Sequence, residues 1–321
     1  MELPSAIATK MDQEHEKIVI TGGSGFLGKS LSRHLSSQGY KVIIVSRHCP
    51  EDSGPWTHKN WDGINNGDWS EELEGASAVV NLAGKSVDCR KTQKNCAEIL
   101  DSRVNSVKAL GKAFETLSSA PKVWIQMSTA HIYGDPPTEL CTEDSPLGEG
   151  LAPKVGEAWE KAYKDHVPDS VRQVILRTSF VIGNRGGAFP KLRTLAKYGL
   201  GGIAGNGKQG ISWIHENDMN ELMQQCIENI RFNGTYVATA PEPVSYASFM
   251  ASLRNSLRSP FGLPAPAWLI RLGAKFILRT DPELILLGRY CKSIRLEEEG
   301  FKFEFSNINE AFEDLISSNQ S

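Results

Sequence analysis

The sequence predicts an α/β fold built on a doubly wound parallel sheet, followed by a smaller mixed lobe. Three observations lead to this prediction. Short apolar runs alternate with helical patterns through the first half of the chain. The runs are almost continuously apolar, which is typical of strands buried on both faces of a parallel sheet. A glycine-rich turn separates the first run from the first helical pattern, as at the start of a βαβ unit.

The elements follow in order. The first strand is expected at KIVI (17–20), and leucines then recur every fourth residue until Gly39 closes the helix. Further strands are expected at residues 41–46, 77–84, 122–128 and 171–179. Helices are expected at 91–118 and 151–163. After residue 183 a glycine-rich stretch is expected at 184–210, a helix at 216–230 and a short strand at 234–240. A region with several prolines follows.

Composition excludes several classes of protein. The chain has 35 Lys+Arg against 38 Asp+Glu, so no positive field favours nucleic acid as a partner. Its 6 cysteines have no CxxC spacing and its 7 histidines form no HxxxH or HExxH run. We therefore expect no metal site and free thiols in a reducing compartment. No run approaches the ~18 apolar residues of a membrane span, so we expect a soluble, cytoplasmic protein without a membrane partner, with an organelle left open.

The segment TGGSGFLG, residues 21–28, is the strongest motif. Its GxxGxxG spacing lies between a predicted strand and a predicted helix. Such a turn lets the backbone approach a pyrophosphate, and the helix N-terminus offers free N–H groups. The alternative is a turn with a structural role only. As a nucleotide site, it would bind through Gly22, Gly23, Ser24, Gly25, Phe26, Leu27 and Gly28.

The end of the second strand selects the nucleotide. An acidic residue there would bind the ribose hydroxyl of NAD, but this chain has Ser46 and Arg47. A guanidinium can grip a 2′-phosphate, so NADP is favoured over NAD, unless Arg47 is only a solvated loop residue. Asp62, after the third strand, either faces the adenine or caps a turn. Small residues are expected beneath the cofactor where the fourth strand ends, at Leu82, Ala83 and Gly84.

These patterns divide the chain into three parts. Residues 1–16 lack a long apolar run and carry acidic residues, so they are expected to be a disordered extension rather than a targeting signal. Residues 17–183 form an NADP-binding Rossmann-like domain. Residues 184–321 form a smaller, mixed C-terminal substrate lobe.

At this point the chain resembles the atypical short-chain dehydrogenases/reductases of the epimerase family, of the 39U member 1 type. The motifs that carry the resemblance are TGGSGFLG, NLAG, SRV (102–104), RTSFVIGNRGGAFP (177–190), WIHENDM (213–219) and the C-terminal EEEGFKFEFSNINEAF. The last of these resembles that family's C-terminal domain of unknown function. The resemblance covers residues 17–315.

The resemblance implies six positions near the cofactor, namely Ser46, Arg47, Leu82, Ala83, Glu98 and Arg103. Arg103 lies on the helix after the fourth strand, so it could reach a phosphate or a ribose. Glu98 lies on the same helix, and its alternative role is to face solvent.

Catalysis in this superfamily uses a Tyr and a Lys four residues later on one helix, together with a Ser at the preceding strand end. Aligning Glu160 with the family's helix Glu puts Ala152 in the Tyr position and Gly156 in the Lys position. The dyad is absent. This departure puts ordinary dehydrogenase or epimerase chemistry in doubt.

Two candidate catalytic residues remain, Ser128 and Tyr133. Ser128 would polarise the substrate oxygen or be a satisfied strand-end hydroxyl. Tyr133 would need its pKa lowered, by His131 or Lys154, and its alternative role is packing or contact with substrate without titration.

Three further side chains have open or structural roles. His215 would touch ligand or be structural. Asp218 is expected to cap a helix. Arg177 leaves a buried strand, where it is either an ion-pair member or an anion clamp.

Two functions therefore stay open. One is an NADP-dependent oxidoreductase or epimerase acting on an unknown small substrate. The other is a non-catalytic NADP(H)-binding sensor or interaction protein. Extended members of the superfamily often form homodimers through a helix pair beside the sheet, so by analogy we expect that a homodimer is possible for either function.

Overall fold

The computed structural model describes residues 16–136, 139–273 and 281–318. The extension expected at residues 1–16 therefore lies, except for Glu16, outside the described residues. No helix in the described ranges is long and apolar enough to cross a membrane. In the same ranges, no three or more His, Cys, Asp or Glu side chains are grouped so that they could hold a metal ion.

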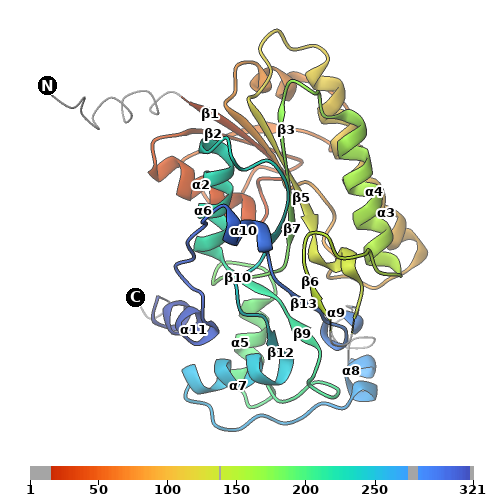
Figure 1. The fold of residues 1–321 in the computed structure, drawn as a ribbon, viewed down its shortest axis with the longest axis vertical. Coiled ribbons are helices and arrows are strands. Elements are labelled where there is room, and N and C mark those ends of the chain that lie inside the picture. Colours follow the sequence, from red (N-terminus) through yellow and green to blue (C-terminus); the bar gives the residue numbers. More distant parts are fainter. Residues whose placement is uncertain (1–15, 137–138, 274–280, 319–321) are drawn as a thin grey trace, which may run out of the picture.

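Seven parallel strands form the central sheet (Figure 1). Across the sheet they lie in the order β11 (Gly234–Ala238), β7 (Arg172–Thr178), β5 (Val123–Thr129), β4 (Ala78–Asn81), β1 (Lys17–Thr21), β2 (Lys41–Ser46) and β3 (Thr57–Asn60). The chain runs outward from β1 in one direction and from β4 in the other. Ligands of such sheets bind outside the carboxyl ends of the strands at this switch point. The predicted strands are confirmed.

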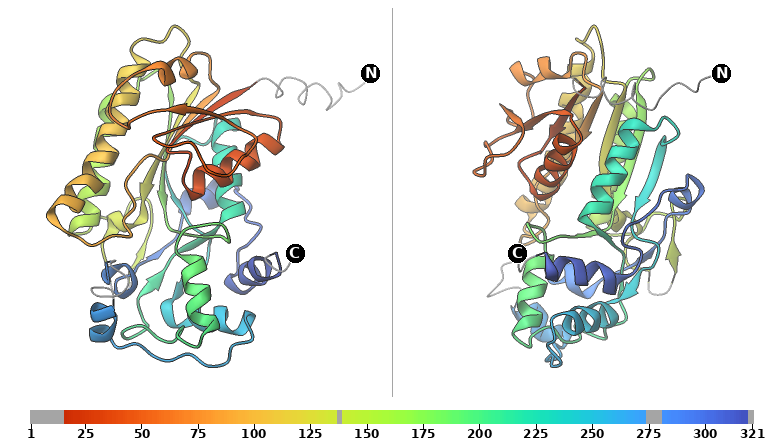
Figure 2. Two further views of the ribbon diagram at one scale, coloured as in Figure 1. Left: turned by 180° about the vertical axis from the view of Figure 1, so that it is seen from behind. Right: turned by 90° about the vertical axis from the view of Figure 1, so that its left-hand side faces the viewer.

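Helices cover both faces of this sheet (Figure 2). One face carries α3 (Gln93–Phe114) and α4 (Leu151–His166), and the other carries α2 (Phe26–Ser37) and α6 (Glu216–Glu228). Helices α4 and α6 both contact β5, and a 3-10 helix, η2 (Asp68–Leu73), packs beside α3. The doubly wound, Rossmann-like fold class is therefore confirmed.

Three elements beyond residue 183 pack with the large sheet rather than with the lobe: β11, α6 and α10 (Ile294–Glu298), whose Leu296 lies in the sheet core. Strand β11 pairs with β7, with Tyr236 opposite Leu176, and α6 packs against α2. The apolar run of β11 predicts a strand, but it does not predict whether that strand pairs in the large sheet or in the lobe. Pairing with β7 is what assigns it to the sheet.

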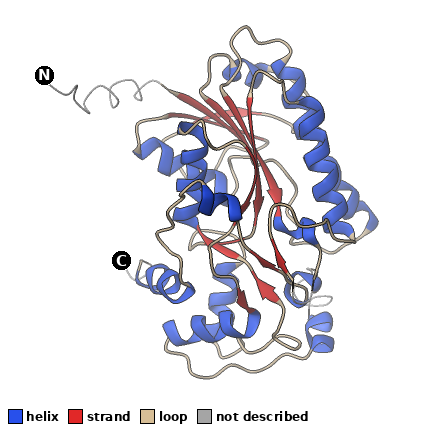
Figure 3. Cartoon of the chain, viewed as in Figure 1, coloured by secondary structure: helices blue, strands red, loops and turns tan. Residues whose placement is uncertain are grey.

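The smaller lobe is formed by short elements (Figure 3). Its two-stranded sheets pair β8 (Phe180–Ile182) with β10 (Trp213–His215), β9 (Gly210–Ile211) with β12 (Val244–Ser245), and β6 (Leu140–Cys141) with β13 (Tyr290–Cys291). Its helices are α5 (Phe189–Lys197), α7 (Tyr246–Ser256), α8 (Ala267–Gly273), α9 (Glu283–Leu286) and α11 (Ile308–Ser317).

Each part has its own hydrophobic core. The sheet core includes Trp124, which stacks on Phe114 at 5.1 Å and meets the edge of the Tyr163 ring at 5.1 Å. The lobe core centres on Phe312, whose ring stacks on Phe189 at 5.6 Å and contacts Phe249 edge-on at 4.9 Å. The two separate cores show that the lobe and the sheet are packed as distinct units.

Candidate dinucleotide and substrate site

The glycine turn between β1 and α2 is held by close backbone packing. Gly22 has a φ of +70°, and a Cβ on it would lie 2.7 Å from the Cα of Ala83. A Cβ on Gly28 would lie 2.4 Å from the Cα of Gly23. A side chain at either position would collide with backbone, so these two glycines are required by the fold of the turn itself.

Gly25 differs from its neighbours because it is exposed and has room around it. A Cβ there would meet only the Gly22 carbonyl oxygen, at an ordinary 3.5 Å. Gly25 is the N-cap of α2 and has no side chain that could satisfy the first N–H groups of the helix. The open approach and the free helix terminus fit the pyrophosphate of a dinucleotide.

The remaining residues of the turn link it to the rest of the molecule. Ser24 is half-buried, and Leu27 packs against the sheet core. The ring of Phe26 lies against the glycine-rich segment that opens the lobe, because a Cβ on Gly186 would come within 2.7 Å of its Cβ atom. The turn and the lobe are thus in direct contact.

At the end of β2, Arg47 is exposed, and Ser46 is buried. The Ser46 hydroxyl donates to the carbonyl of His48 at 2.9 Å and lies 3.1 Å from Nε2 of His58. Arg47 has no such internal partner among the residues that the structure describes. The guanidinium is therefore free to meet a ligand at the sheet edge.

Asp62 has the turn-capping role. Its Oδ1 accepts hydrogen bonds from the backbone N–H groups of Ile64 and Asn65, both at 2.8 Å. The Asn65 amide donates to Oδ2 at 2.7 Å. These bonds lower the pKa of the Asp62 carboxyl, the backbone bond from Asn65 most. Both carboxylate oxygens are occupied within the turn itself.

A buried polar cluster underlies the end of β4. Asn81 Oδ1 accepts from the Thr21 hydroxyl at 2.7 Å and from the backbone N–H of Ala83 at 3.1 Å. Its amide donates to Gln126 at 3.0 Å. Asn81 thus holds β1, β4 and β5 in register where Leu82, Ala83 and Gly84 leave the sheet. Sequence reasoning did not single it out, although an Asn ending an otherwise apolar strand was a visible signal.

Arg103 lies under the same strand end. Its Nη1 donates to the carbonyls of Ile99 at 2.9 Å and Lys85 at 3.0 Å. Its guanidinium carbon lies 4.9 Å from the centre of the Trp159 ring, and a Cβ on Gly84 would come within 3.1 Å of it. Burial lowers the pKa of Arg103 to about 10. This cation faces no carboxylate among the described residues.

Glu98 is paired with lysines. It forms ion pairs with Lys85 and, at 3.9 Å, with Lys94. The hydrogen bond from Lys85 lowers the pKa of the Glu98 carboxyl. Its side chain is 43% exposed, as expected for the solvent-facing alternative.

The two candidate catalytic residues belong to one buried network. The Ser128 hydroxyl donates to Oε1 of Glu160 at 2.7 Å. Arg177 grips both oxygens of the same carboxylate at 2.9 Å, and its Nη1 donates to the Tyr133 hydroxyl at 2.9 Å. All four side chains are at least nine-tenths buried. Arg177 is therefore an ion-pair member, one of the two roles expected for it.

Tyr133 is not activated by its surroundings. Burial raises the pKa of Tyr133 well above its usual value, against the lowering effect of Arg177. The expected lowering of its pKa by His131 or Lys154 is therefore wrong. Burial and the charges of Arg289 and Lys91 lower the pKa of His131 to about 3, so His131 is neutral. Desolvation disfavours the phenolate more than one nearby guanidinium stabilises it.

The position of the missing lysine is filled by another side chain. A Cβ on Gly156 would lie 3.0 Å from Cγ1 and 3.1 Å from Cδ1 of Ile132, which belongs to η3 (Ala130–Tyr133). Glu160, one turn further along α4, carries the buried charge instead. Sequence reasoning used Glu160 only to align the helix, and its pairing with Arg177 of β7 depends on how α4 packs on β5 and η3.

His215 is structural. Its Nδ1 accepts from the backbone N–H of Asn217 at 3.2 Å and so caps α6, and its ring lies 4.1 Å from that of Phe305. Asp218 was expected to be the cap, which is wrong. Its carboxylate accepts from the N–H groups of Glu304 and Phe305 instead, at 2.7 and 3.1 Å. Trp213 is fully buried, as expected.

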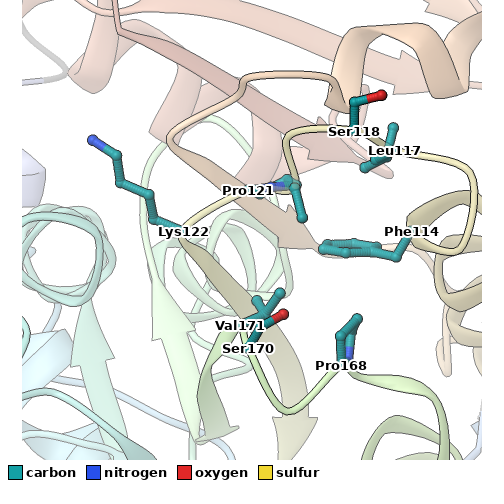
Figure 4. Close-up of a pocket in the computed structure, with 9 residues that line it drawn as sticks. Phe114, Leu117, Ser118, Pro121, Lys122, Pro168, Ser170 and Val171 are labelled. Atoms are coloured by element: carbon teal, nitrogen blue, oxygen red, sulfur yellow. The ribbon is translucent and has the colours of Figure 1, made fainter.

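Two surface pockets lie near these elements. One of 450 Å³ is lined by Tyr133, Cys141 and Gly148, beside the carboxyl end of β5. The other, of 580 Å³, includes Lys122 and Val171 at the amino ends of β5 and β7 (Figure 4). In a parallel sheet the amino ends lie opposite the nucleotide turn. Only the first pocket borders the candidate site.

Comparison with known proteins supports this assignment. The sequence profile "NAD dependent epimerase/dehydratase family" matches residues 18–238, and "Domain of unknown function (DUF1731)" matches residues 265–315. "Epimerase family protein YfhF" of Bacillus subtilis is 32% identical, over 93% of this chain and 97% of that protein. "Epimerase family protein SDR39U1" of Bos taurus is 27% identical, over 94% of this chain and 99% of that protein.

A solved structure extends the likeness to the fold. The human epimerase family protein SDR39U1, crystallised with NADPH, matches with a TM-score of 0.83 at 27% identity. The match covers 94% of this chain and 99% of that one. As the resemblance predicted, the chain belongs to the NAD dependent epimerase/dehydratase family.

Proposed function

We propose that this protein binds NADP(H) at the carboxyl edge of the sheet. The observation that carries the proposal is the open turn at Gly25, where an exposed helix N-terminus faces solvent. Gly22, Gly23 and Gly28 shape that turn, and the half-buried Ser24, Phe26 and Leu27 complete it. The NADPH bound to the human relative supports the same ligand.

Arg47 would select NADP(H) over NAD(H). It is exposed where β2 ends, and no acidic residue takes the place that binds a ribose hydroxyl. The buried Ser46 and the self-capped Asp62 are engaged internally, so Arg47 is the side chain left to meet a 2′-phosphate. Leu82, Ala83 and Gly84 would lie under the cofactor, with Arg103 beneath them.

The nucleotide preference is tested with Arg47→Ala. A charge-assisted bidentate contact contributes about 1.5–3 kcal/mol, so NADPH affinity should fall about 10-fold or more while NADH affinity stays unchanged. Isothermal titration calorimetry with both nucleotides measures this. Arg231→Ala is the matched control, because Arg231 is exposed just before the amino end of β11. Equal losses for NADPH and NADH would contradict the role of Arg47.

The reaction that fits this family is hydride exchange with a small polar or nucleotide-linked substrate held between the sheet and the lobe. When bound, the nicotinamide supplies or accepts the hydride. The chain supplies no Tyr–Lys proton relay. The Ser128 hydroxyl donates a hydrogen bond to Glu160, and Arg177 donates one to the Tyr133 hydroxyl, so these residues would position a substrate rather than titrate.

A second candidate function is NADP(H) binding without turnover, as in a redox sensor or interaction protein. The network of Ser128, Glu160, Arg177 and Tyr133 favours it, because both candidate catalytic hydroxyls are already engaged inside the protein. The cofactor proposal is common to both functions.

One assay separates the two. NADPH oxidation is followed at 340 nm against a panel of carbonyl compounds and nucleotide sugars, using protein whose NADPH affinity is measured in parallel. Turnover that falls in Ser128→Ala or Tyr133→Phe, with NADPH affinity unchanged, supports the oxidoreductase. Tight NADPH binding without turnover across the panel supports the sensor. Absence of NADPH binding overturns both.

Partners and location follow as proposals of the same kind. We propose a small-molecule substrate, no nucleic acid or membrane partner, and a cytoplasmic location, although one Arabidopsis thaliana relative is named chloroplastic. A homodimer would use α3 and α4, which pack side by side on one face of the sheet. Analytical ultracentrifugation tests the dimer, and cell fractionation tests the location.

A further inference from the structure

Two of the six cysteines lie directly opposite each other on neighbouring strands. Cys141 of β6 pairs with Cys291 of β13 in parallel register. Neighbouring strands are about 4.8 Å apart, which lies within the 4.4–6.8 Å Cα separation that a disulfide spans. Both side chains belong to one buried cluster that also contains Tyr133. The strand register therefore places the two Cα atoms within the separation that a disulfide spans.

The two thiols differ in how they can be reached. Cys141 is only 4% exposed but lines the 450 Å³ surface pocket beside Tyr133, whereas Cys291 is 0% exposed and does not line that pocket. A small reagent in the pocket would meet Cys141 first. Cys226 is also buried, but on α6, away from this pair.

A buried cation stands beside the pair. Arg289 is 7% exposed and its Nε has no hydrogen-bond partner. The hydrogen bond from Cys291 and the charge of Arg289 lower the pKa of the Cys141 thiol. The hydrogen bond to Cys141, together with burial, raises the pKa of Cys291. The thiol that lines the pocket thus has the greater thiolate character, and the thiolate is the form that reacts.

We propose that Cys141 and Cys291 are a peroxide-reactive dithiol that closes to a disulfide. The Cys141 thiolate attacks one oxygen of hydrogen peroxide, the O–O bond breaks, and hydroxide leaves. Cys141 becomes a sulfenic acid by a two-electron oxidation, and the peroxide is reduced. The Cys291 sulfur then attacks the Cys141 sulfur, its S–O bond breaks, and the departing hydroxide takes the Cys291 proton to leave as water.

Closure would tie two distant parts of the chain together. Strand β6 follows η3, which carries Tyr133, and β13 leads into α10. Glu143 already bridges these parts, because its carboxylate accepts from the Ser293 hydroxyl and from the Ile294 N–H at 3.1 Å. A disulfide would join these two parts covalently, and a dithiol reductant would separate them again. The chemistry involves no nucleotide, so it stands independently of the proposed function.

The test uses the wild-type full chain treated with hydrogen peroxide. We expect loss of two of the six thiols, and a peptide pair joined through Cys141 and Cys291 in a non-reducing digest analysed by mass spectrometry. Dithiothreitol should restore both thiols. Cys226→Ser and Cys49→Ser are the matched controls, for a buried and an exposed cysteine outside the pair. Both should still form the linked peptide.

A variant traps the intermediate. In Cys291→Val the buried apolar space is kept but no resolving thiol remains, so dimedone should label Cys141 at least 10-fold more than in the wild type. Circular dichroism tests whether the variant is folded. If it is not, the digest of the peroxide-treated wild type still shows whether Cys141 and Cys291 become linked. Peroxide-treated wild type with no link between Cys141 and Cys291, or with its main link elsewhere, overturns the proposal.

Discussion

Gly156 of α4 lies against Ile132 of η3, so closely that a Cβ at Gly156 would be 3.0 Å from the Ile132 Cγ1. The position where this superfamily carries its catalytic lysine is therefore a packing contact in this protein. Ile132 is fully buried, so it cannot turn away into solvent. The space beside position 156 is thus occupied by the core residue Ile132, so a side chain could not be restored there without repacking its neighbour.

This contact predicts the effect of Gly156→Ala. Alanine favours a helix by about 1 kcal/mol over glycine, but overpacking a core costs about 1–3 kcal/mol. We expect the free energy of unfolding to fall by about 1 kcal/mol. Glu157→Ala, on the exposed face of the same helix, is the control. Denaturant unfolding measures both.

The same contact predicts a coupling. Ile132→Ala removes the two atoms nearest to the added Cβ, so Gly156→Ala should cost less, by about 1 kcal/mol, in that background. A double-mutant cycle in guanidinium chloride gives this value. If the two substitutions were additive, the packing explanation would be wrong.

The ion pair of Glu160 with Arg177 predicts a large loss of stability for Glu160→Gln. Removing one partner of a buried pair leaves an uncompensated charge and costs about 3–5 kcal/mol. Glu157→Gln changes an exposed carboxylate three residues earlier and should cost less than about 0.5 kcal/mol. Replacing both partners, as in Glu160→Leu with Arg177→Met, should recover much of the loss. Similar unfolding midpoints for the two single variants would argue against a stabilising pair.

The glycine turn predicts that a substitution at Gly25 affects nucleotide binding, whereas a substitution at Gly22 affects the stability of the fold. Gly25→Ala should leave the melting temperature without ligand nearly unchanged, because the added Cβ has room. It should weaken NADPH binding by about 10-fold or more, since it occupies the approach of the pyrophosphate. Gly22→Ala should instead lower the stability of the ligand-free protein, because its φ is +70° and backbone lies 2.7 Å away. Thermal melts and calorimetry with both variants check this, and the reverse pattern would count against the proposed nucleotide position.

His215 predicts a pH dependence of stability. Burial lowers the pKa of its imidazole from the usual 6.5 to about 4, although Asp314 opposes the shift. Between these values the unfolded chain binds more protons, so the unfolding free energy falls as the pH drops from about 6.5 to about 4. Its share of the loss between pH 7 and pH 5 should be about 2 kcal/mol.

The test of that slope is His215→Asn, which can still cap α6 but does not titrate. The difference in unfolding free energy between pH 7 and pH 5 should shrink by about 2 kcal/mol relative to the wild type. Asp218, whose pKa is raised to about 6 by burial, contributes an opposite slope in both proteins and cancels in the comparison. His48→Asn, at an exposed position, is the control. An unchanged slope in His215→Asn would show that this histidine is not buried in its neutral form.

Local patterns predicted much of the fold. Strands β1, β2, β4, β5 and β7 and the glycine turn follow from runs and spacings within a few residues. Such features can be predicted because the residues that form them are close together in the sequence. The membership of β11 in the sheet could not be predicted in this way, because pairing with β7 joins residues about 60 apart in the chain. The cap of α6 was assigned to Asp218 rather than His215 for a similar reason, since the partners of Asp218 lie near residue 305.

The sequence by itself determined the glycine turn between β1 and α2, the presence of Arg47 rather than an acidic residue after β2, and the absence of the Tyr–Lys dyad. Each depends on residue type at a fixed local position. Only the tertiary structure decided what replaces the dyad. Packing of α4 on η3 and β5 brings Ser128, Tyr133, Glu160 and Arg177 into one buried network. Charges in a low-dielectric interior must find partners, and those partners come from wherever the fold places them.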